Sequence, residues 1–389
     1  MKTKTLDFES APECLPDITR IRHQIHENPE IALHEHNTAA LVRETLNKNG
    51  IETLAPFLGT DVVAMIHGSK QGRNVTLRAD MDALPLQEKT GLPYQSKTDG
   101  LMHACGHDGH TAMLIGAALV LNKLKESFDG SIRFVFQPGE EVEAAGKQLV
   151  KKGVLKDPEP SAVFALHSFD DLPVGAIASK PGVFLAAAEF FKITVKGRGA
   201  HGAMPHKSID PILTASRIVE ALQTVPSRLT PPLHPVVLSV CRLAGGTNSN
   251  IIPDTVEMEG TTRYLDPDTG NRIPILIEQL VKGVCDSVGA SYEFIYEKTY
   301  IPTINDPAIV ECGRKVTEKH IGKHAWFDIS EPSMGGEDFA FYLKDYPGAM
   351  FRLGMGENSP PLHNPAFDFN DQALKNGILF LVAAALESL

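Results

Sequence analysis

Three short apolar segments, each followed closely by acidic or imidazole side chains, constrain the fold of this chain most. The segments span residues 74–78, 131–136 and 162–166, and they lead into Asp80 and Asp82, into Glu140 and Glu141, and into His167. Their apolar composition, and the Pro and Gly that end the second one, predict buried strands. In an open α/β sheet the ligand crevice lies beyond the carboxyl ends of the strands. We therefore expect these side chains to converge at one edge of a sheet.

The segment His103–His110, with the sequence HACGHDGH, combines a thiol with three imidazoles. Cys105 and His107 are two residues apart, so both side chains can converge from one loop. Thiolate and neutral imidazole are typical ligands of zinc and similar divalent ions. Apolar residues then recur at helical spacing from Met113 to Leu124, which places the loop at the start of a buried helix. The segment predicts half of a metal site carried on a rigid element.

The acidic pair Glu140 and Glu141 follows the predicted strand 131–136 after the short segment Gln137-Pro138-Gly139. Adjacent residues there point in different directions, so one carboxylate can bind a metal while the other faces the substrate or a water. His103 and Asp108 are expected to accept or donate hydrogen bonds to ligating imidazoles, since such rings usually bind a neighbour through their second nitrogen.

Four further histidines lie near the N-terminus, in surroundings that are helical and charged. They are His23, His26, His34 and His36. We interpret them as a solvated surface, with His34 as the strongest candidate for another role.

Length and composition favour a two-domain globular protein. The chain has 389 residues, more than one hydrophobic core usually holds. Hydrophobic residues make up 42% and form no apolar run of eighteen, which disfavours a membrane span. The segment Met1 to Ser10 is polar and predicts no secretory signal, hence a cytoplasmic location.

Cysteine usage and charge agree with that location. The five cysteines are odd in number and scattered, which argues against a disulfide framework and suits a reducing compartment. The net charge of −11 disfavours nucleic acid and anionic membranes as partners.

The order of predicted elements divides the chain. Strand and helix signals alternate up to about Pro181, as in a doubly wound, mostly parallel sheet. A β-α-β-β-α-β order typical of a ferredoxin-like α+β unit follows, with strands near 189–195, 235–243, 255–265 and 291–297 and helices near 210–222 and 273–288. The chain then returns with helices near 307–320 and 371–389. We expect a catalytic domain formed by residues 1–186 and 299–389, interrupted by a second domain at residues 187–298.

Seven motifs in order resemble the M20 metallopeptidase clan. They are HACGHDGH, FQPGEE, LHS, GRGAHGAMPH, GGTNSNIIPD, GGEDFAFY and LHNPAFDFND, and they span nearly the whole chain. The branch that they resemble is the amidohydrolases, which includes hippurate hydrolases, N-acyl-amino-acid deacetylases and auxin-conjugate hydrolases. The resemblance implies metal-dependent hydrolysis of the amide bond of a small N-acyl amino acid, of the hippurate or N-acetyl type. It also implies that the inserted domain is a lid and a dimer interface, in a homodimer or a dimer-based tetramer.

The resemblance also assigns roles to residues. The implied ligands of two divalent ions are Cys105, His107, Glu141, His167 and His363. Zinc or manganese is expected, with nickel or cobalt as alternatives. Glu140 matches the general base, and Asp82 matches a second acidic residue that orients a metal-binding imidazole. Most clan members have a histidine where Asp80 stands, so the identity of the bridging ligand stays open.

Three residues of the inserted domain match lid residues of the family. His201 matches a histidine that stabilises the oxyanion in the partner subunit's site. Asn250 and Arg263 match residues that contact the substrate, and a guanidinium suits a bidentate grip on an α-carboxylate.

Other functions remain open. A short-peptide hydrolase of the aminopeptidase type is the nearest alternative. A cysteine hydrolase is disfavoured because Cys105 lacks a strand-to-helix elbow and would be bound to the metal. A non-catalytic, metal-stabilised binding protein is disfavoured because no structural zinc site needs Glu140. The acyl group, whether benzoyl, acetyl, indole-acyl or long-chain, is not determined by the sequence.

Overall fold

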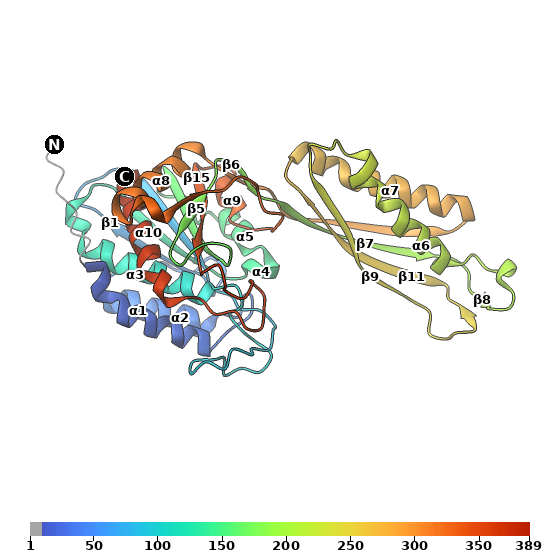
Figure 1. The fold of residues 1–389 in the computed structure, drawn as a ribbon, viewed down its shortest axis with the longest axis horizontal. Helices are drawn as coiled ribbons and strands as arrows, with labels where there is room; N and C mark the ends of the chain where they lie inside the picture. Colours follow the sequence, from blue (N-terminus) through green and yellow to red (C-terminus); the bar gives the residue numbers. More distant parts are fainter. Residues whose placement is uncertain (1–9) are drawn as a thin grey trace. The chain divides into compact units, whose positions relative to one another are not determined.

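The computed structural model describes residues 10–389, which divide into two compact units. Unit 1 comprises the chain up to Phe184, Ile304–Glu331 and Asp338–Leu389, and unit 2 comprises Leu185–Thr303 and Pro332–Glu337. The helices and strands of both units are drawn in Figure 1. Each unit has its own hydrophobic core. The polar segment used to predict the absence of a secretory signal lies outside the described residues, except for Ser10. Within residues 10–389, no helix is long and apolar enough to cross a membrane.

Unit 1 is built on a seven-stranded sheet of order β1-β3-β2-β4-β15-β5-β14. The four central strands β3, β2, β4 and β15 are parallel, whereas β1 and β5 run antiparallel to β3 and β15. The expected mostly parallel α/β sheet is therefore confirmed. Its strands are β1 (Val62–His67), β2 (Asn74–Asp80), β3 (Ser131–Gln137), β4 (Ala162–Phe169), β5 (Ile177–Ser179), β14 (Trp326–Asp328) and β15 (Gly348–Gly354).

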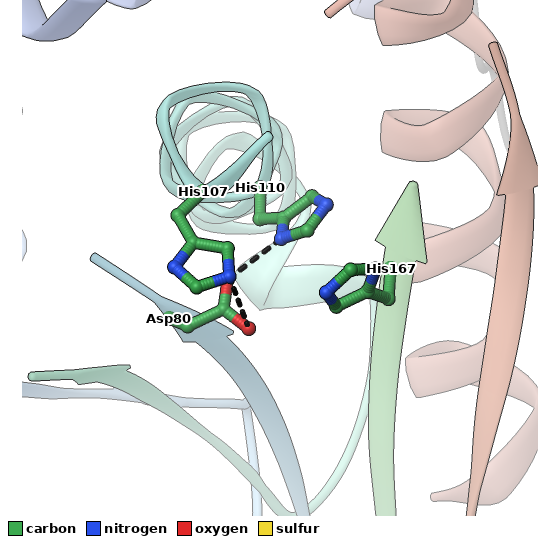
Figure 2. Close-up of side chains that lie close together, drawn as sticks. All are labelled: Asp80, His107, His110 and His167. Carbon is green, nitrogen blue, oxygen red and sulfur yellow. Dashed lines mark hydrogen bonds and ion pairs between the residues drawn. The ribbon is translucent and has the colours of Figure 1, made fainter. Parts of the chain in front are cut away.

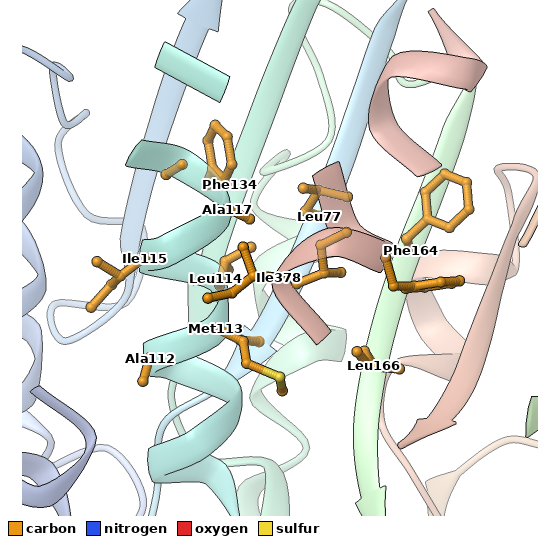
Figure 3. Packing of buried hydrophobic residues seen from close by; sticks show 14 of the residues in the cluster. Leu77, Ala112, Met113, Leu114, Ile115, Ala117, Phe134, Phe164, Leu166 and Ile378 are labelled. Atoms are coloured by element: carbon orange, nitrogen blue, oxygen red, sulfur yellow. The ribbon is translucent and has the colours of Figure 1, made fainter. Parts of the chain in front are cut away.

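One face of this sheet is covered by helix α3 (His107–Lys123), which packs between α1 (Ser10–Glu27) and α10 (Leu374–Ser388). Its residues Met113 and Leu114 lie in the same apolar cluster as Leu77 of β2 and Ile378 of α10 (Figure 3). The first residues of α3 are therefore held by a tightly packed core, and the side chains that they carry have little freedom.

The opposite face carries a buried polar cluster. Arg78 follows Leu77 on β2, so its side chain points to the other side of the sheet. There it donates to Asp338, whose carboxylate also accepts the N–H of Gly146. Gly146 belongs to α5 (Ala145–Lys151). The remaining helices of the unit are α2 (His36–Lys48), α4 (Glu140–Glu143), α8 (Pro307–His320) and α9 (Ala340–Leu343).

Unit 2 contains a four-stranded antiparallel sheet of order β12-β7-β11-β9 with two helices. Its elements are β7 (Ala187–Lys196), α6 (Pro211–Leu222), β9 (Val236–Gly245), β11 (Thr255–Tyr264), α7 (Pro267–Val288) and β12 (Ser291–Tyr300), with the short pair β8 (Ala200–His201) and β10 (Ile251–Ile252). This is the predicted β-α-β-β-α-β order. Phe191, Ile193 and Val195 alternate with more exposed residues along β7, because one face of the sheet packs on the helices.

The loop at residues 332–337, which contains Gly335 and Gly336, belongs to a different unit from the one expected. Residues 332–337 belong to unit 2, although they were expected in the domain formed by residues 1–186 and 299–389. The N–H of Ala186 donates to the carbonyls of Ser333 and Gly335, which ties the loop to the start of unit 2. The short strands β6 (Gly182–Leu185) and β13 (Thr303–Asn305) pair where the chain passes between the units.

The prediction of a solvated histidine surface is wrong for His26. Its side chain is fully buried, with Nδ1 2.8 Å from Asp108 Oδ2 and Nε2 3.4 Å from Glu88 Oε1. The charged residues near His26 in sequence suggested a surface. The partners of its ring, Asp108 and Glu88, instead come from distant parts of unit 1. His34 and His36 are exposed, as expected, and His23 is half-buried.

Candidate metal centre

Side chains from three strand ends meet the start of α3 in unit 1. Asp80 is the last residue of β2, Glu140 begins α4 with two residues between it and the end of β3, and His167 lies near the end of β4. Figure 2 shows Asp80 and His167 facing His107 and His110 of α3. This is the edge of the sheet at which the sequence analysis places a ligand.

The five predicted ligands lie together. Cys105 Sγ, a ring nitrogen of His107 and a carboxylate oxygen of Glu141 lie within 4.8 Å of one another. His167 Nε2 is 3.5 Å from Cys105 Sγ, and His363 Nε2 is 3.3 Å from Glu141 Oε1. One thiol, one carboxylate and three imidazoles are a donor set suited to zinc or a similar transition metal.

Backbone carbonyls fix the tautomers of two of these rings. His107 Nδ1 donates to the carbonyl of Asp82 at 2.8 Å, and His167 Nδ1 donates to the carbonyl of Ser168 at 2.8 Å. A carbonyl can only accept, so in each neutral ring Nε2 is left with its lone pair. Among the described residues, His107 Nε2 is buried without a hydrogen-bond partner. These residues fit a bound metal ion, which would satisfy that nitrogen.

The charges at the site also favour a cation. Burial would lower the pKa of His107, but the carboxylates of Asp80, Asp82 and Glu141 raise it to about 10. Burial raises the pKa of the Cys105 thiol, and the nearby carboxylates raise it further. The carboxylates that raise the pKa of the buried His107 imidazole would also attract a divalent ion, because both effects come from their negative charge.

Helix α4 is held in place by Asp82. The Asp82 carboxylate accepts the N–H of Glu140 and the N–H of Glu141, each at 3.0 Å. Its Oδ1 also lies 3.4 Å from His107 Nδ1. Asp82 therefore contacts the buried Glu140, its neighbour Glu141 and the His107 ring at once. These contacts support the orienting role that the resemblance implies, which stays a prediction.

His110 lies in the cluster but differs from the other rings. Its Nε2 accepts the N–H of Ser168 at 2.8 Å, so Nδ1 carries the proton and donates to Asp80 Oδ1 at 2.6 Å. Both nitrogens are thereby used, and His110 holds the Asp80 carboxylate. Asp80 Oδ2 lies 2.7 Å from Arg78 Nη1. No role for His110 was expected from the sequence, although its i,i+3 spacing from His107 places both rings on one helix face.

The expectation that Asp108 partners a ligating imidazole is wrong. Asp108 Oδ2 instead binds His26 at 2.8 Å and Arg22 at 3.2 Å, because the helix turns its side chain toward α1. His103 is buried, and burial lowers its pKa to about 4. Among the described residues, neither of its ring nitrogens has a hydrogen-bond partner.

The backbone of His363 is constrained. Its φ is 62°, in the left-handed region that few residues other than glycine adopt. Its N–H donates to the carbonyl of Ala104 at 2.8 Å, next to Cys105. The strained conformation is thus held by a contact with the loop that carries another candidate ligand, as is common at functional sites.

The three predicted lid residues lie in unit 2. His201 is exposed, and its Nδ1 accepts the N–H of Ala203 at 3.0 Å, which leaves the ring proton on Nε2. Asn250 is exposed and its carbonyl accepts the N–H of Gly202. Arg263 is half-buried, with its guanidinium 5.6 Å from the centre of the Phe190 ring.

Comparison with known proteins places the chain in a family. Residues 76–387 match the model of peptidase family M20/M25/M40. The chain belongs to this family. The match spans all five candidate ligands and Glu140 in unit 1, together with the predicted lid residues of unit 2.

Relatives of this M20/M25/M40 chain include hydrolases of N-acyl compounds. It is 40% identical to N-acetylcysteine deacetylase from Bacillus subtilis, over 92% of this chain and 93% of the relative. It is 38% identical to an IAA-amino acid hydrolase from Arabidopsis thaliana, over 92% and 82%. A solved Bacillus subtilis structure, described as a dinuclear metal-binding peptidase of family M20, superposes with a TM-score of 0.84 at 34% identity, covering 97% of this chain and 98% of that one.

Proposed function

We propose that this protein hydrolyses the amide bond of N-acyl amino acids with the help of divalent metal ions, releasing a carboxylic acid and a free amino acid. The observation that carries this proposal is the cluster of Cys105, His107 and Glu141 beside the buried Glu140. The names of the deacetylase and of the IAA-amino acid hydrolase support the substrate class.

Each part of the site has a role in this reaction. Cys105, His107, Glu141, His167 and His363 would hold two divalent ions, zinc or manganese before nickel or cobalt. When bound, such ions supply the Lewis acidity that activates water and polarises an amide carbonyl. Glu140 takes the proton of the attacking water and delivers it to the leaving nitrogen. Asp82 keeps Glu140 and Glu141 in place through their N–H groups.

The inserted residues 187–298 are proposed as a lid and dimerisation domain of a homodimer or a dimer-based tetramer. In this proposal His201 donates its Nε2 proton to the oxyanion in the partner subunit's site. Asn250 contacts the substrate, and Arg263 binds its α-carboxylate. The cytoplasmic location stays a prediction from the sequence.

A substrate panel tests the proposal. The protein is stripped with a chelator, reloaded separately with Zn²⁺, Mn²⁺, Ni²⁺ or Co²⁺, and incubated with N-acetyl, N-benzoyl, indole-acyl and long-chain acyl amino acids. Release of free amino acid is measured, and we expect it only after reloading. Preferential cleavage of dipeptides would favour the short-peptide hydrolase instead. No cleavage of any substrate with any of the four ions would contradict the proposal.

A further inference from the structure

Ser168 in β4 contacts Cys105, His110 and His167 of the candidate metal centre, although it has no part in the proposed reaction. It is fully buried, and its three polar groups together contact three residues of the site, with the hydroxyl also lying 3.1 Å from His110 Nε2. Its hydroxyl donates to the carbonyl of Cys105 at 2.8 Å, its N–H donates to His110 Nε2 at 2.8 Å, and its carbonyl accepts from His167 Nδ1 at 2.8 Å.

These contacts join elements that have no covalent connection nearby. Cys105 lies in the loop before α3, whereas His167 lies on β4, sixty-two positions later. The Ser168 hydroxyl links this loop to the strand end through the Cys105 carbonyl, and beside this link Cys105 Sγ lies 3.5 Å from His167 Nε2. Without the hydroxyl, the Cys105 carbonyl would lose a buried partner and the loop could move away from the strand.

The loop is shaped to receive this hydroxyl. Gly106 follows Cys105 and has a φ of 89°. A Cβ atom at position 106 would lie 2.4 Å from Ser168 Oγ, so a residue with a side chain does not fit beside the serine. The close approach and the left-handed backbone both serve the same contact.

We infer that Ser168 is a positioning residue of the metal centre, whose hydroxyl holds the Cys105 loop so that the thiolate and the His167 imidazole can bind the same ion. This rests on the proposed function, because it takes Cys105 and His167 as ligands. Residues that orient ligands without touching the metal typically change metal affinity by about 10-fold to 100-fold when they are removed.

The test is a Co²⁺ titration of the chelator-stripped protein, followed by the thiolate-to-cobalt charge-transfer band in the near ultraviolet. This band reports cobalt binding to a cysteine thiolate, which in the proposed centre is that of Cys105, and it needs no turnover. In Ser168→Ala we expect the band to require about 10-fold to 100-fold more free Co²⁺ than in the wild type. The backbone N–H and carbonyl of residue 168 remain, so the change isolates the hydroxyl.

Ser179→Ala is the matched control. Ser179 is also buried in the same sheet, and its hydroxyl donates to the carbonyl of Met350 at 2.8 Å. A purely structural loss would lower the melting temperature in both variants and leave both cobalt midpoints near that of the wild type, which would overturn the inference. If the wild type itself shows no thiolate band, the proposed metal centre is wrong rather than the role of Ser168 alone.

Discussion

At the scale of single residues, hydrogen bonds decide which similar side chains can bind a metal. His107 and His167 each give their Nδ1 proton to a carbonyl, so Nε2 remains available. His110 is as deeply buried, yet both its nitrogens are used by Ser168 and Asp80. Residue type alone would group the three rings together, whereas their hydrogen-bond partners separate two candidate ligands from a ring whose nitrogens are both occupied.

Glu140 is expected to be essential for turnover and unnecessary for metal binding. Replacing it in Glu140→Gln keeps the shape but removes the base, so hydrolysis should fall below detection while metal content stays unchanged. Mass-spectrometric metal analysis of the purified variant, beside an activity assay, checks this. Loss of metal in Glu140→Gln, with metal retained in Glu141→Gln, would show that the two roles are exchanged.

Gly106 should tolerate no side chain. Gly106→Ala places a non-glycine residue at a φ of 89° and a Cβ atom 2.4 Å from Ser168 Oγ. Gly91→Ala is the matched control, because Gly91 has a φ of 69° but no atom within 4 Å of the added Cβ. We expect a cost of about 1 to 2 kcal/mol for the control from the backbone alone. Gly106→Ala should lose about 1 to 3 kcal/mol more from overpacking, measured by urea unfolding; equal losses would mean that the loop relaxes freely.

At the scale of elements, α1 is joined to the first turn of α3 by buried charges. Arg22 and His26 of α1 both bind Asp108 of α3, and Arg22 also lies 2.8 Å from Asp368 Oδ1. Buried ion pairs of this kind are costly to break, because the partner that remains is left charged and unpaired. Asp108 directly follows His107, so this cluster fixes the part of α3 that carries a candidate ligand.

The His26 pair should make stability fall at alkaline pH. Burial disfavours the imidazolium, but Asp108 and Glu88 raise the pKa of His26 to about 9 from an ordinary value of 6.5. Its contribution is therefore fully present below about pH 6.5 and is lost as the pH rises toward 9, and the shift corresponds to on the order of 3 kcal/mol. Urea unfolding of chelator-treated wild type and His26→Gln at several pH values checks this. The difference between the two proteins should shrink from pH 6 to pH 9.5, and a constant difference would contradict the assignment.

At the scale of the whole molecule, the residues expected to carry out the reaction and those expected to contact the substrate belong to different units. All candidate metal ligands and Glu140 belong to unit 1, whereas His201, Asn250 and Arg263 belong to unit 2. If the proposed dimer supplies His201 to the partner subunit, then each complete site needs two chains.

Mixing two inactive variants tests this proposal. His201→Ala should lower kcat by roughly a hundredfold or more, since an oxyanion donor contributes on the order of 3 kcal/mol. After subunit exchange with Glu140→Gln, a heterodimer would contain one site with both residues intact, so activity should return. Native mass spectrometry verifies the exchange, and heterodimers without recovered activity would exclude a shared site.

Much of the fold could be predicted because local patterns determine it. The strand at 131–136 and the helix at 307–320 match β3 (Ser131–Gln137) and α8 (Pro307–His320), since apolar spacing and the residues Pro and Gly act within a few positions. The grouping of Cys105, His107 and Glu141 followed from motifs whose residues lie at strand and helix ends. Their roles as ligands stay predictions until metal binding is measured.

The sequence by itself determined the mostly parallel α/β architecture, the inserted β-α-β-β-α-β unit and the family, because these depend on periodicity and on motifs that are contiguous in the chain. Only the tertiary structure decided that His26 is buried, that Asp108 faces α1 and that His110 holds Asp80. Ser168 likewise became visible only when β4 and the Cys105 loop lay side by side. The physical reason is that hydrogen-bond partners and burial arise from residues far apart in sequence, which local patterns do not bring together.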